Sequence, residues 1–398
     1  MSGKRVKLGI VGGRRGSAYN LSIESFRERV ELTAICDVSE AVLANWQQAH
    51  PGIRTFTSYE AMLSSDACDA VALATPMVQH AAQAVQALQA GKHVMCEIIA
   101  ALTLDECWQL VEAVEKSGLV YMMAENYCYS RTNMMVLNMA QQGVFGEITY
   151  AEGGYIHDTR DLVLTPDGQV TWRGELRRIN GNTYPTHSAG PVAQWVGAVH
   201  GGADRFVSAA TFVTSARSLR SYIKDQLGAD HPTAREELWN GADSATTVLQ
   251  TAKGVLIVLR RDGSSPRPHN MFHFELQGTK GAFLSPRHPK EGPLVWIEGV
   301  SPGHSPGDAE WEDLWKYAGR YEHPRWQQWG ETACKAGHGG GDFFILDDFL
   351  AAIETGAKPA IDVYDAVTWS AIMPVSIESV AKGGVPIEMP NFAKNARR

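Results

Sequence analysis

The most informative absences in this sequence concern long apolar runs, positive charge and cysteine pairs. No apolar run approaches the roughly 20 residues that a membrane-spanning helix needs, so we expect no membrane insertion. The 36 lysines and arginines are outnumbered by 44 aspartates and glutamates, and the net charge of −8 argues against nucleic-acid binding, which needs a basic face. The six cysteines form no Cys-x-x-Cys pair and no Cys/His spacing typical of zinc, so we expect buried free thiols and no metal site.

The length and the first residues of the chain bound its organisation. A chain of 398 residues exceeds one ordinary hydrophobic core, and we expect two or three domains. A hydrophobic content of 44% and a charged content of 20% are typical of a soluble globular protein. The opening residues, MSGKRVKLGIVGG, enter an apolar strand at once, so we expect no signal peptide and a cytoplasmic protein.

Apolar strands alternate with amphipathic helices through residues 1–126. This alternation predicts a parallel sheet covered on both faces, the doubly wound Rossmann arrangement of an α/β domain. In this predicted first domain the strands are VKLGIV, ELTAIC, DAVALAT, HVMCE and VYMMAEN, and the helices span 18–27, 39–48, 79–90 and 104–116.

The pattern changes after Arg131, where a short helix leads into segments that alternate apolar and polar residues. These segments are EITYAEGGYIH, RFVSAATFVT, TTVLQTAKGVLIVLRR and HFELQGTKGAFLS. Such alternation predicts a half-exposed, largely antiparallel open sheet. We therefore expect a second, α+β domain over 127–398 that binds the substrate. Within it we predict long loops over 301–341 and helices over 343–355 and 363–382, the C-terminal helix being able to pack back on the first domain.

The segment LGIVGGRRGSAY joins the first predicted strand to the first helix. In register, the dinucleotide fingerprint G-x-G-x-x-G falls on Val11, Gly13 and Gly16, so the first glycine is missing and Gly12 stands beside it. Asp37 ends the second strand, where an acid accepts hydrogen bonds from a ribose, and this favours NAD over NADP. A nucleotide-free Rossmann-like fold remains the alternative. The candidate cofactor residues of this segment are Gly12, Gly13, Arg14, Arg15, Gly16 and Asp37.

Further candidate residues, all polar except Met77, follow three more predicted strands. Since the carboxyl ends of parallel strands meet at one edge of the sheet, where ligands bind, we expect these side chains near the cofactor. Each taken alone is more often a helix cap or a loop residue. The candidates are Thr75, Met77 and His80 in ATPMVQHA, Glu97 in GKHVMCE, and Asn126 in AEN.

The segment NGNTYPTHSAGP places Tyr184 and His187 three residues apart, outside the cofactor motif. The pair either packs in the core or transfers protons. Histidine takes and returns a proton near neutral pH, whereas a tyrosine acts as a base only where nearby positive charge stabilises its phenolate. Two further segments stay open. The tryptophan-rich EWEDLWKYAGRYEHPRWQQWG either stacks on a sugar or packs internally, and GHGGGDF either caps a helix or reaches the site through His338 or Asp342.

Taken together, TPxxxH, GKHVxxE and the following sheet domain resemble the glucose-fructose oxidoreductase, inositol dehydrogenase and MocA family. Dehydrogenases of that family read Glu-Lys-Pro where this chain has Glu97-Ile98-Ile99. Seven blocks resemble instead its NAD-dependent alpha-N-acetylgalactosaminidase branch. They are CEIIAALTLDECWQLVEAVEKSG, AENYCYSR, YIHDTR, GNTYPTHSAGPVAQW, SPRPH with LQGTKG, GHGGGDF and DVYDAVTWSAIMP.

The resemblance implies a glycosidase that oxidises carbon 3 of the sugar, eliminates the aglycone, adds water and reduces carbon 3 again. Such a route needs no pair of carboxylates, and the acids Asp158, Asp161 and Glu175 form no convincing pair in this sequence. The resemblance assigns catalysis to Tyr184 and His187, substrate binding to Tyr155, Arg173, Tyr184, Pro185, Thr186, His187 and His269, and a further NAD contact to Tyr184.

Several alternatives remain open at this point. The branch reads Arg-Pro-Tyr where this chain has Arg267-Pro268-His269, so the sugar is either like an N-acetylgalactosaminide or like a sulfoquinovoside. A sulfoquinovoside is anionic and suits several cations in the second domain. An NAD-dependent sugar dehydrogenase and a sugar-sensing protein that uses NAD structurally are the other functions. We expect a small glycoside as the substrate and a homo-oligomer, a dimer or a tetramer. The cations are Arg160, Arg173, Arg267, His157 and His269.

Overall fold

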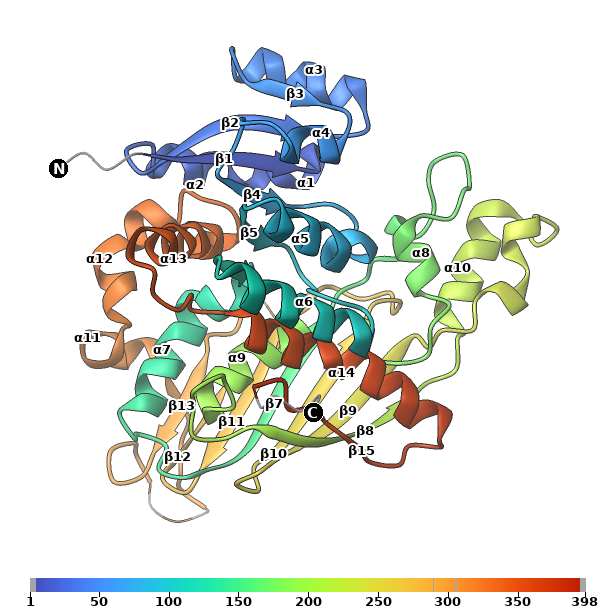
Figure 1. The fold of residues 1–398 in the computed structure, drawn as a ribbon. Helices are drawn as coiled ribbons and strands as arrows, with labels where there is room; N and C mark the ends of the chain where they lie inside the picture. The colour runs from blue at the N-terminus through green and yellow to red at the C-terminus, as the bar shows by residue number, and fades with distance from the viewer. Residues whose placement is uncertain (1–4, 289, 304, 306, 394–398) are drawn as a thin grey trace. The chain divides into compact units, whose positions relative to one another are not determined.

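The computed structural model describes residues 5–288, 290–303, 305 and 307–393 (Figure 1). The chain divides into two compact units. The first comprises Met1–Ser130, Pro324–Ser370 and Asn391–Arg398, and the second comprises Arg131–His323 and Ala371–Pro390. The ends of the two predicted domains, residues 1–4 and 394–398, lie outside the described residues.

The segment 324–370 groups with the first unit, whereas the sequence-based division placed it in the second domain. Its side chains explain this difference. The Phe343 ring lies 4.6 Å from the Phe26 ring, and Arg29 forms an ion pair of 2.6 Å with Asp347. These contacts join residues that are far apart in the chain, which local patterns do not indicate.

The first unit contains the predicted doubly wound sheet. Among the described residues, six strands form it in the order β3-β2-β1-β4-β5-β6, and every neighbouring pair is parallel, so this prediction is confirmed. Its strands are β1 (Val6–Val11), β2 (Val30–Cys36), β3 (Arg54–Phe56), β4 (Ala70–Leu73), β5 (His93–Cys96) and β6 (Tyr121–Met123). Its helices are α1 (Gly13–Gly16), η1 (Ser17–Tyr19), α2 (Asn20–Ser25), α3 (Glu40–Ala49), α4 (Tyr59–Leu63), η2 (Met77–Gln79), α5 (His80–Gln89), α6 (Leu104–Ser117), η3 (Asn126–Tyr129), α12 (Pro324–Ala333), η8 (His338–Gly340) and α13 (Gly341–Thr355). Helix α14 (Val363–Ala381) begins in this unit and ends in the second.

Local signals explain why the predicted helices of this unit begin where they do. The Ser39 hydroxyl accepts a hydrogen bond from the Val42 N–H at the start of α3. At the start of α6, Thr103 and Glu106 form a reciprocal capping box. Gly118 ends α6 in the left-handed conformation that glycine adopts without strain.

Helix α12 lies in the stretch that the sequence predicted as long loops, and that prediction is wrong. Pro324 stands at the first helical position, where a missing N–H costs nothing. Trp326 is buried, its ring lies 5.1 Å from that of Phe344, and its Nε1 donates to the Tyr129 carbonyl oxygen at 3.1 Å. The tryptophans that suggested a sugar platform therefore include a core residue.

The second unit contains the predicted open sheet. Within the described part of the chain, nine strands form it in the order β14-β13-β12-β11-β7-β10-β9-β8-β15. The pair β7 and β10 is parallel and the others are antiparallel, so a largely antiparallel sheet is confirmed. Its strands are β7 (Ile148–Ile156), β8 (Phe206–Val213), β9 (Ser244–Thr251), β10 (Leu256–Asp262), β11 (Asn270–Gly278), β12 (Gly281–Leu284), β13 (Leu294–Ile297), β14 (Glu312–Asp313) and β15 (Ile387–Glu388). Its helices are α7 (Arg131–Gln141), η4 (Arg160–Leu162), α8 (Trp172–Leu176), α9 (Thr186–Val196), α10 (Ser218–Leu227), η5 (Pro232–Ala234), η6 (Glu236–Leu238), η7 (Leu314–Tyr317) and α11 (Ala318–Tyr321).

Helix α9 lies directly against strand β7 of this sheet. A Cβ at Gly153 would come within 2.3 Å of the Ser188 carbonyl oxygen, so the two backbones touch where β7 has no side chain. Most residues of α9 are buried, His187 among them. The contact fixes the start of α9 relative to the end of β7, and both ends carry candidate site residues.

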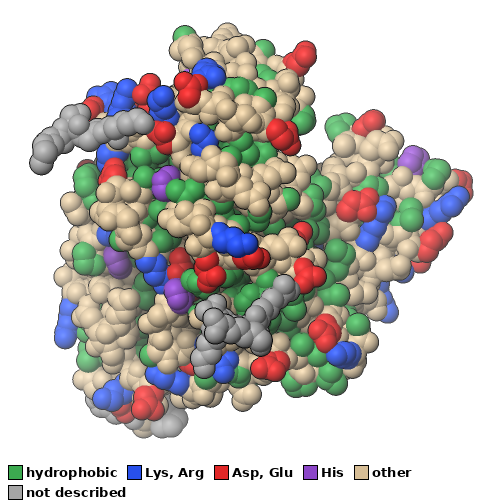
Figure 2. Space-filling model, in the orientation of Figure 1, with side chains coloured by type: hydrophobic (Ala, Val, Ile, Leu, Met, Phe, Trp, Pro, Cys, Tyr) green, Lys and Arg blue, Asp and Glu red, His purple; other side chains and the backbone are tan. Residues whose placement is uncertain are grey.

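The surface is mixed in charge, and most of the cysteines are buried. On the face shown in Figure 2, acidic and basic side chains are interspersed and do not gather into one basic patch. Among the described helices, none has the length and apolar character needed to cross a membrane. All six cysteines are free thiols, and five are buried as expected, whereas Cys334 is exposed.

Candidate active site

The turn between β1 and α1 has the geometry of a dinucleotide-binding loop. Gly12 has a φ of 92°, and a Cβ there would lie 2.6 Å from the Ala74 carbonyl oxygen, so only glycine fits. A Cβ at Gly16 would lie 2.2 Å from Ile10 Cγ2, so the first helical turn packs directly on β1. A tight turn and close packing of helix on strand are two tasks of the fingerprint glycines. The loop performs both although Val11 replaces the first glycine.

Asp37 holds the same loop from the end of β2. Its Oδ2 accepts a hydrogen bond of 2.8 Å from the Gly13 N–H, and its Oδ1 accepts one of 2.9 Å from the Ser39 N–H. The carboxylate therefore lies beside the glycine loop, where Rossmann domains hold the ribose of the nucleotide. Loop and acid together fit a bound NAD.

The other predicted cofactor residues follow the ends of the strands. Arg14 is exposed in α1, and Met77 is buried at the start of η2. The Thr75 hydroxyl donates to Gln83 Oε1 at 2.6 Å. Asn126 is buried after β6, and its Oδ1 has no hydrogen-bond partner among the described residues. An orphaned acceptor at this sheet edge suits a ligand that donates to it.

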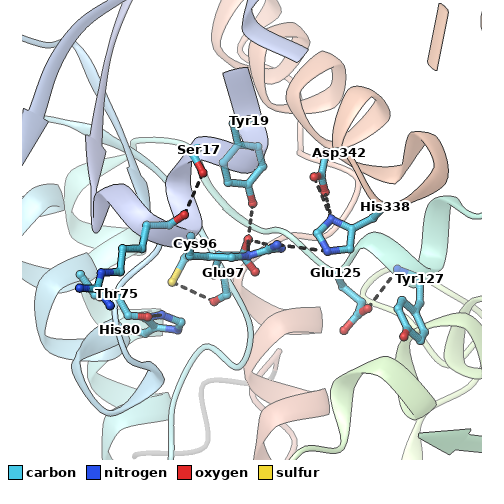
Figure 3. A network of polar contacts seen from close by, with 12 residues as sticks. Ser17, Tyr19, Thr75, His80, Cys96, Glu97, Glu125, Tyr127, His338 and Asp342 are labelled. Atoms are coloured by element: carbon cyan, nitrogen blue, oxygen red, sulfur yellow. Dashed lines mark hydrogen bonds and ion pairs between the residues drawn. The ribbon is translucent and has the colours of Figure 1, made fainter. Parts of the chain in front are cut away.

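Arg15 belongs to a charged network in the first unit, of which Figure 3 labels Tyr19, Glu97, His338 and Asp342. Its Nε and Nη2 lie 2.8 and 2.7 Å from Glu97 Oε1, and the Tyr19 hydroxyl donates to the same oxygen at 2.8 Å. Arg15 Nη1 lies 3.1 Å from His338 Nε2, and His338 Nδ1 lies 2.8 Å from Asp342 Oδ2. The network therefore joins the cofactor loop to the start of α13.

The protonation of this network follows from its donors and acceptors. Burial acts against the charge of Arg15, but the negative charges around it, above all that of Glu97 and also that of Asp342, outweigh burial and raise the pKa of Arg15. Burial, and then the charge of Glu97, raise the pKa of Tyr19, which stays a phenol and donates. Because a guanidinium only donates, His338 Nε2 must accept. Its proton is then on Nδ1 and is donated to Asp342.

The sequence left the GHGGGDF segment open, and the structure places its His338 beside Arg15, 323 positions away. No local signal links the two residues, because only the packing of α13 in the first unit brings them together.

His80 is buried below the ends of β4 and β5. Its Nδ1 lies 2.9 Å from the Ile99 carbonyl oxygen, and its Nε2 lies 2.9 Å from the Thr75 carbonyl oxygen. Burial lowers the pKa of His80. Both ring nitrogens thus contact the backbone and tie two strand ends together, and a contact from this ring to the cofactor stays a prediction.

Three aromatic rings of the predicted site meet in the second unit. Tyr155 stands near the end of β7, Tyr184 lies two residues before α9, and His187 lies in the first turn of α9. The ring centroids of Tyr155 and Tyr184 are 5.3 Å apart, those of Tyr155 and His187 are 5.0 Å apart, and those of Tyr184 and His187 are 5.3 Å apart. The structure therefore brings together the residues that the resemblance assigned to catalysis and one assigned to the sugar.

The residues between Tyr184 and His187 position the helix. The Pro185 carbonyl oxygen accepts hydrogen bonds from the N–H groups of Ser188 and Ala189 at 3.1 and 2.9 Å. Thr186 is buried, and its hydroxyl has no hydrogen-bond partner among the described residues. Pro185 thus begins the first turn of α9, and Thr186 faces inward.

Two histidines extend the ring cluster. The Tyr155 hydroxyl lies 2.7 Å from His157 Nδ1, and the ring centroids of His157 and His269 are 4.1 Å apart. Burial, and then the charge of His269, lower the pKa of His157, which favours the neutral ring. A neutral His157 can accept the hydrogen bond that Tyr155 donates. His269, predicted from the SPRPH block, therefore lies one ring away from Tyr155.

A cavity of about 130 Å³ opens beside these rings. Arg173, predicted from the sequence, lines it. Arg177 and Arg261 also line it, and sequence reasoning missed both. Arg261 is the register partner of Tyr155 in the parallel pair β7 and β10, and no sequence pattern shows this register. The lining residues are Tyr155, His157, Thr159, Leu162, Trp172, Arg173, Leu176, Arg177, Thr183, Tyr184 and Arg261.

The remaining predicted cations lie elsewhere. Arg160 is paired with Asp158 through two hydrogen bonds of 2.9 and 2.8 Å, so its charge is already compensated. Arg267 is exposed and does not belong to the cavity lining. Within the described residues, no group of three or more His, Cys, Asp or Glu side chains is arranged to hold a metal ion.

Comparison with known families gives two matches along the chain. Residues 6–125 match the family described as "Oxidoreductase family, NAD-binding Rossmann fold", and residues 129–397 match the family described as "Glycosyl hydrolase 109, C-terminal domain". The first match confirms the predicted cofactor, NAD.

Individual proteins resemble the chain over nearly its whole length. A glycosyl hydrolase family 109 protein of Stenotrophomonas maltophilia is 36% identical, covering 99% of this chain and 90% of its own. A glycosyl hydrolase family 109 protein of Solibacter usitatus is 37% identical, and the match covers 98% of this chain and 88% of the relative. Levoglucosan dehydrogenase in complex with NADH has a TM-score of 0.76 at 20% identity, covering 98% of this chain and 100% of its own. At that identity the likeness of the structures is one of fold.

Proposed function

The chain belongs to the glycosyl hydrolase 109 family, and from that premise we propose that it is an NAD-dependent glycosidase acting on an alpha-glycoside of a hexopyranose. The observation that carries the proposal is the cluster of Tyr155, Tyr184 and His187 rings beside the cavity. An ordinary glycosidase flanks the glycosidic bond with two carboxylates. None of the described residues that line this cavity is Asp or Glu, which favours a route that needs no such pair.

When bound, NAD supplies a reversible oxidation at carbon 3 of the sugar, which makes the proton on carbon 2 acidic while the oxidation lasts. We assign to His187 the role of taking the proton from the 3-hydroxyl and returning it later, because an imidazole takes and returns a proton near neutral pH. Tyr184, as its phenolate, takes the proton from carbon 2, and the electron pair left behind expels the aglycone from carbon 1. Water then adds its hydroxyl to carbon 1 across the new double bond, Tyr184 returns a proton to carbon 2, and the proton that the water loses balances the one that the departed aglycone takes up.

The neighbours of these two residues suit those roles. Arg173 lines the same cavity as Tyr184, and nearby positive charge stabilises a phenolate. Tyr155 donates to the neutral His157, which fixes the phenol ring between Tyr184 and His187. Substrate contacts are proposed for Tyr155, Arg173, Tyr184, Pro185, Thr186, His187 and His269.

The glycine loop and Asp37 are proposed to hold the nucleotide, with Arg15 as the charged contact that Glu97 orients. The strand-end residues complete this site. The full proposed set is Gly12, Gly13, Arg14, Arg15, Gly16, Asp37, Thr75, Met77, His80, Glu97, Asn126 and Tyr184. The sugar is proposed to be like an N-acetylgalactosaminide or like a sulfoquinovoside. A cytoplasmic location and a homo-oligomeric dimer or tetramer stay predictions.

An assay with a panel of aryl alpha-glycosides, with and without added NAD⁺, tests the proposal. The aglycone and the absorbance of NADH are followed together. We expect many turnovers of aglycone release on the NAD that the purified protein carries, with no net NADH. Tyr184→Phe is the test variant, because it removes the proposed catalytic hydroxyl and keeps the ring, and it should lose aglycone release. Aglycone release that needs one fresh NAD⁺ for each product would contradict a closed cycle.

The second candidate is an NAD-dependent sugar dehydrogenase, which the oxidoreductase match over residues 6–125 favours. Ile98 argues against it, since it stands where the dehydrogenases that the chain resembles place a lysine, and it is buried and carries no proton acceptor. NADH that accumulates with the substrate consumed, without aglycone release, would decide for the dehydrogenase.

A further inference from the structure

The cavity beside Tyr155 and Tyr184 has positive charge that its own walls do not offset. Three guanidinium groups, those of Arg173, Arg177 and Arg261, line it, and none of its described lining residues is acidic. Arg173 is exposed, and its guanidinium lies over the Trp172 ring. Arg177 and Arg261 are buried, with 8% and 5% of their surface exposed. Burying a cation costs free energy unless an anion or hydrogen-bond acceptors replace the lost water.

Arg177 has unused hydrogen-bonding capacity. Its Nη2 donates to the Thr159 hydroxyl, while its Nη1 is buried without a hydrogen-bond partner in the described part of the chain. A Cβ at Gly263 would lie 2.3 Å from the guanidinium, so the backbone there leaves room for this side chain. The sequence thus places a buried cation at the cavity wall and satisfies only part of it.

Arg261 is held at the cavity wall by strand β10. Its neighbour Asp262 points to the opposite face of β10, because side chains alternate along a strand. The Asp262 carboxylate accepts hydrogen bonds from the backbone of Ser264 and Ser265 and from the Ser265 hydroxyl. Burial lowers the pKa of Arg261 to about 10, against the raising effect of Asp262 and Tyr155. At neutral pH Arg261 therefore remains a cation at the cavity wall.

We propose that this cavity binds an oxyanion carried by the glycoside, a carboxylate, sulfonate or sulfate, and that Arg177 and Arg261 thereby select anionic sugars over neutral ones. The planar guanidinium fork matches such groups with paired, charge-assisted hydrogen bonds. The inference rests on the proposed function and narrows its substrate class, away from the neutral N-acetylgalactosaminide.

Steady-state kinetics of the NAD-loaded enzyme test the inference. The substrates are the 4-nitrophenyl alpha-glycosides of a uronic acid, of sulfoquinovose, of N-acetylgalactosamine and of glucose. Because a hydrogen bond to a charged group contributes about 1.5–3 kcal/mol, we expect kcat/KM for an anionic glycoside to exceed that for the neutral ones by roughly 10- to 100-fold. Arg261→Met and Arg177→Met should each lower this ratio. Arg235→Met, which replaces an exposed arginine outside the cavity, is the matched control and should leave it unchanged.

Binding measurements separate this inference from the proposed function. Calorimetry with free glucuronate, sulfoquinovose and N-acetylgalactosamine reports affinity without turnover. If the anionic sugars bind selectively but their glycosides are not cleaved, the oxyanion-binding role of the cavity is supported and the proposed glycosidase function is refuted. If neutral glycosides bind and turn over as well as anionic ones, the selection of anionic sugars is refuted and the proposed glycosidase function stands. A preference for the uronide or for the sulfoquinovoside identifies which oxyanion fits the cavity. If the Arg177 or Arg261 variant fails to fold, Arg173→Met, at an exposed position, takes its place in the test.

Discussion

Gly153 offers the sharpest test of how the fold positions the proposed catalytic residues. Replacing Gly153 by Ala places a Cβ 2.3 Å from the Ser188 carbonyl oxygen, 3.0 Å from its carbonyl carbon and 3.2 Å from its Cα. All three atoms belong to the backbone of α9, so no side-chain rotation relieves the overlap. Reaching the 3.4 Å of ordinary contact from 2.3 Å requires a displacement of about 1.1 Å between α9 and β7.

That displacement should affect both stability and rate. Overpacking of this kind costs about 1–3 kcal/mol. At about 2–4 °C per kcal/mol for a domain of 150–250 residues, the melting temperature should fall by roughly 2–12 °C. Because His187 lies in the first turn of α9 and Tyr155 near the end of β7, the same shift misplaces the proposed base relative to the sugar. A misplacement of about 1 Å costs on the order of 10²-fold in rate, so kcat should fall by about that factor.

Thermal unfolding and aglycone release measure the two effects. The matched control is Gly319→Ala in α11, where no atom lies within 4 Å of the added Cβ and the residue is exposed. We expect the control to keep the melting temperature and kcat of the wild type. A Gly153→Ala variant that melts and turns over like the control would refute both the close contact and the role of α9 in positioning His187.

The remaining predictions concern the reaction, the cofactor and pH. Product formed in D₂O should carry deuterium at carbon 2, and protium alone there, measured by NMR, would exclude the elimination. Tyr184→Phe should lower turnover by about 10²–10⁴-fold while NAD stays bound. Ile98→Lys should not increase hydrolysis, and a large gain would mean that His187 is not the base for the 3-hydroxyl. His338→Ala should weaken NAD binding, measured by fluorescence titration, and His338→Gln should restore it because its amide oxygen accepts from Arg15. If His338→Ala lowers NAD affinity equally in an Arg15→Ala background, His338 does not act through Arg15. The pKa of His157 lies below its ordinary 6.5 in the folded protein. As pH falls below 6.5, the imidazole is therefore protonated in the unfolded chain before it is protonated in the folded one. The free energy of unfolding should therefore decrease with falling pH in denaturant titrations, and less so in His157→Gln.

Local chemistry explains what was predictable from the sequence. Apolar runs flanked by capped helices determine the elements of the first unit, since Ser39 and Thr103 act within one turn of the helices they begin. Alternation of apolar and polar residues indicates the open sheet for the same reason, because side chains alternate between its faces. The Tyr184 to His187 block is also local, and its start at Pro185 follows from neighbouring residues.

Long-range packing decided the rest. Helix α12 was missed because its tryptophan is buried against Phe344 and Tyr129, which the surrounding loop-like residues do not indicate. The partnership of Arg15 with His338 depends on how α13 packs in the first unit. The parallel register of β7 and β10 places Arg261 beside Tyr155 and adds a buried cation to the cavity wall. A strand's own residues specify which side chains share a face, but only pairing with another strand specifies which neighbour each one meets, and here that pairing determines the chemistry of the cavity.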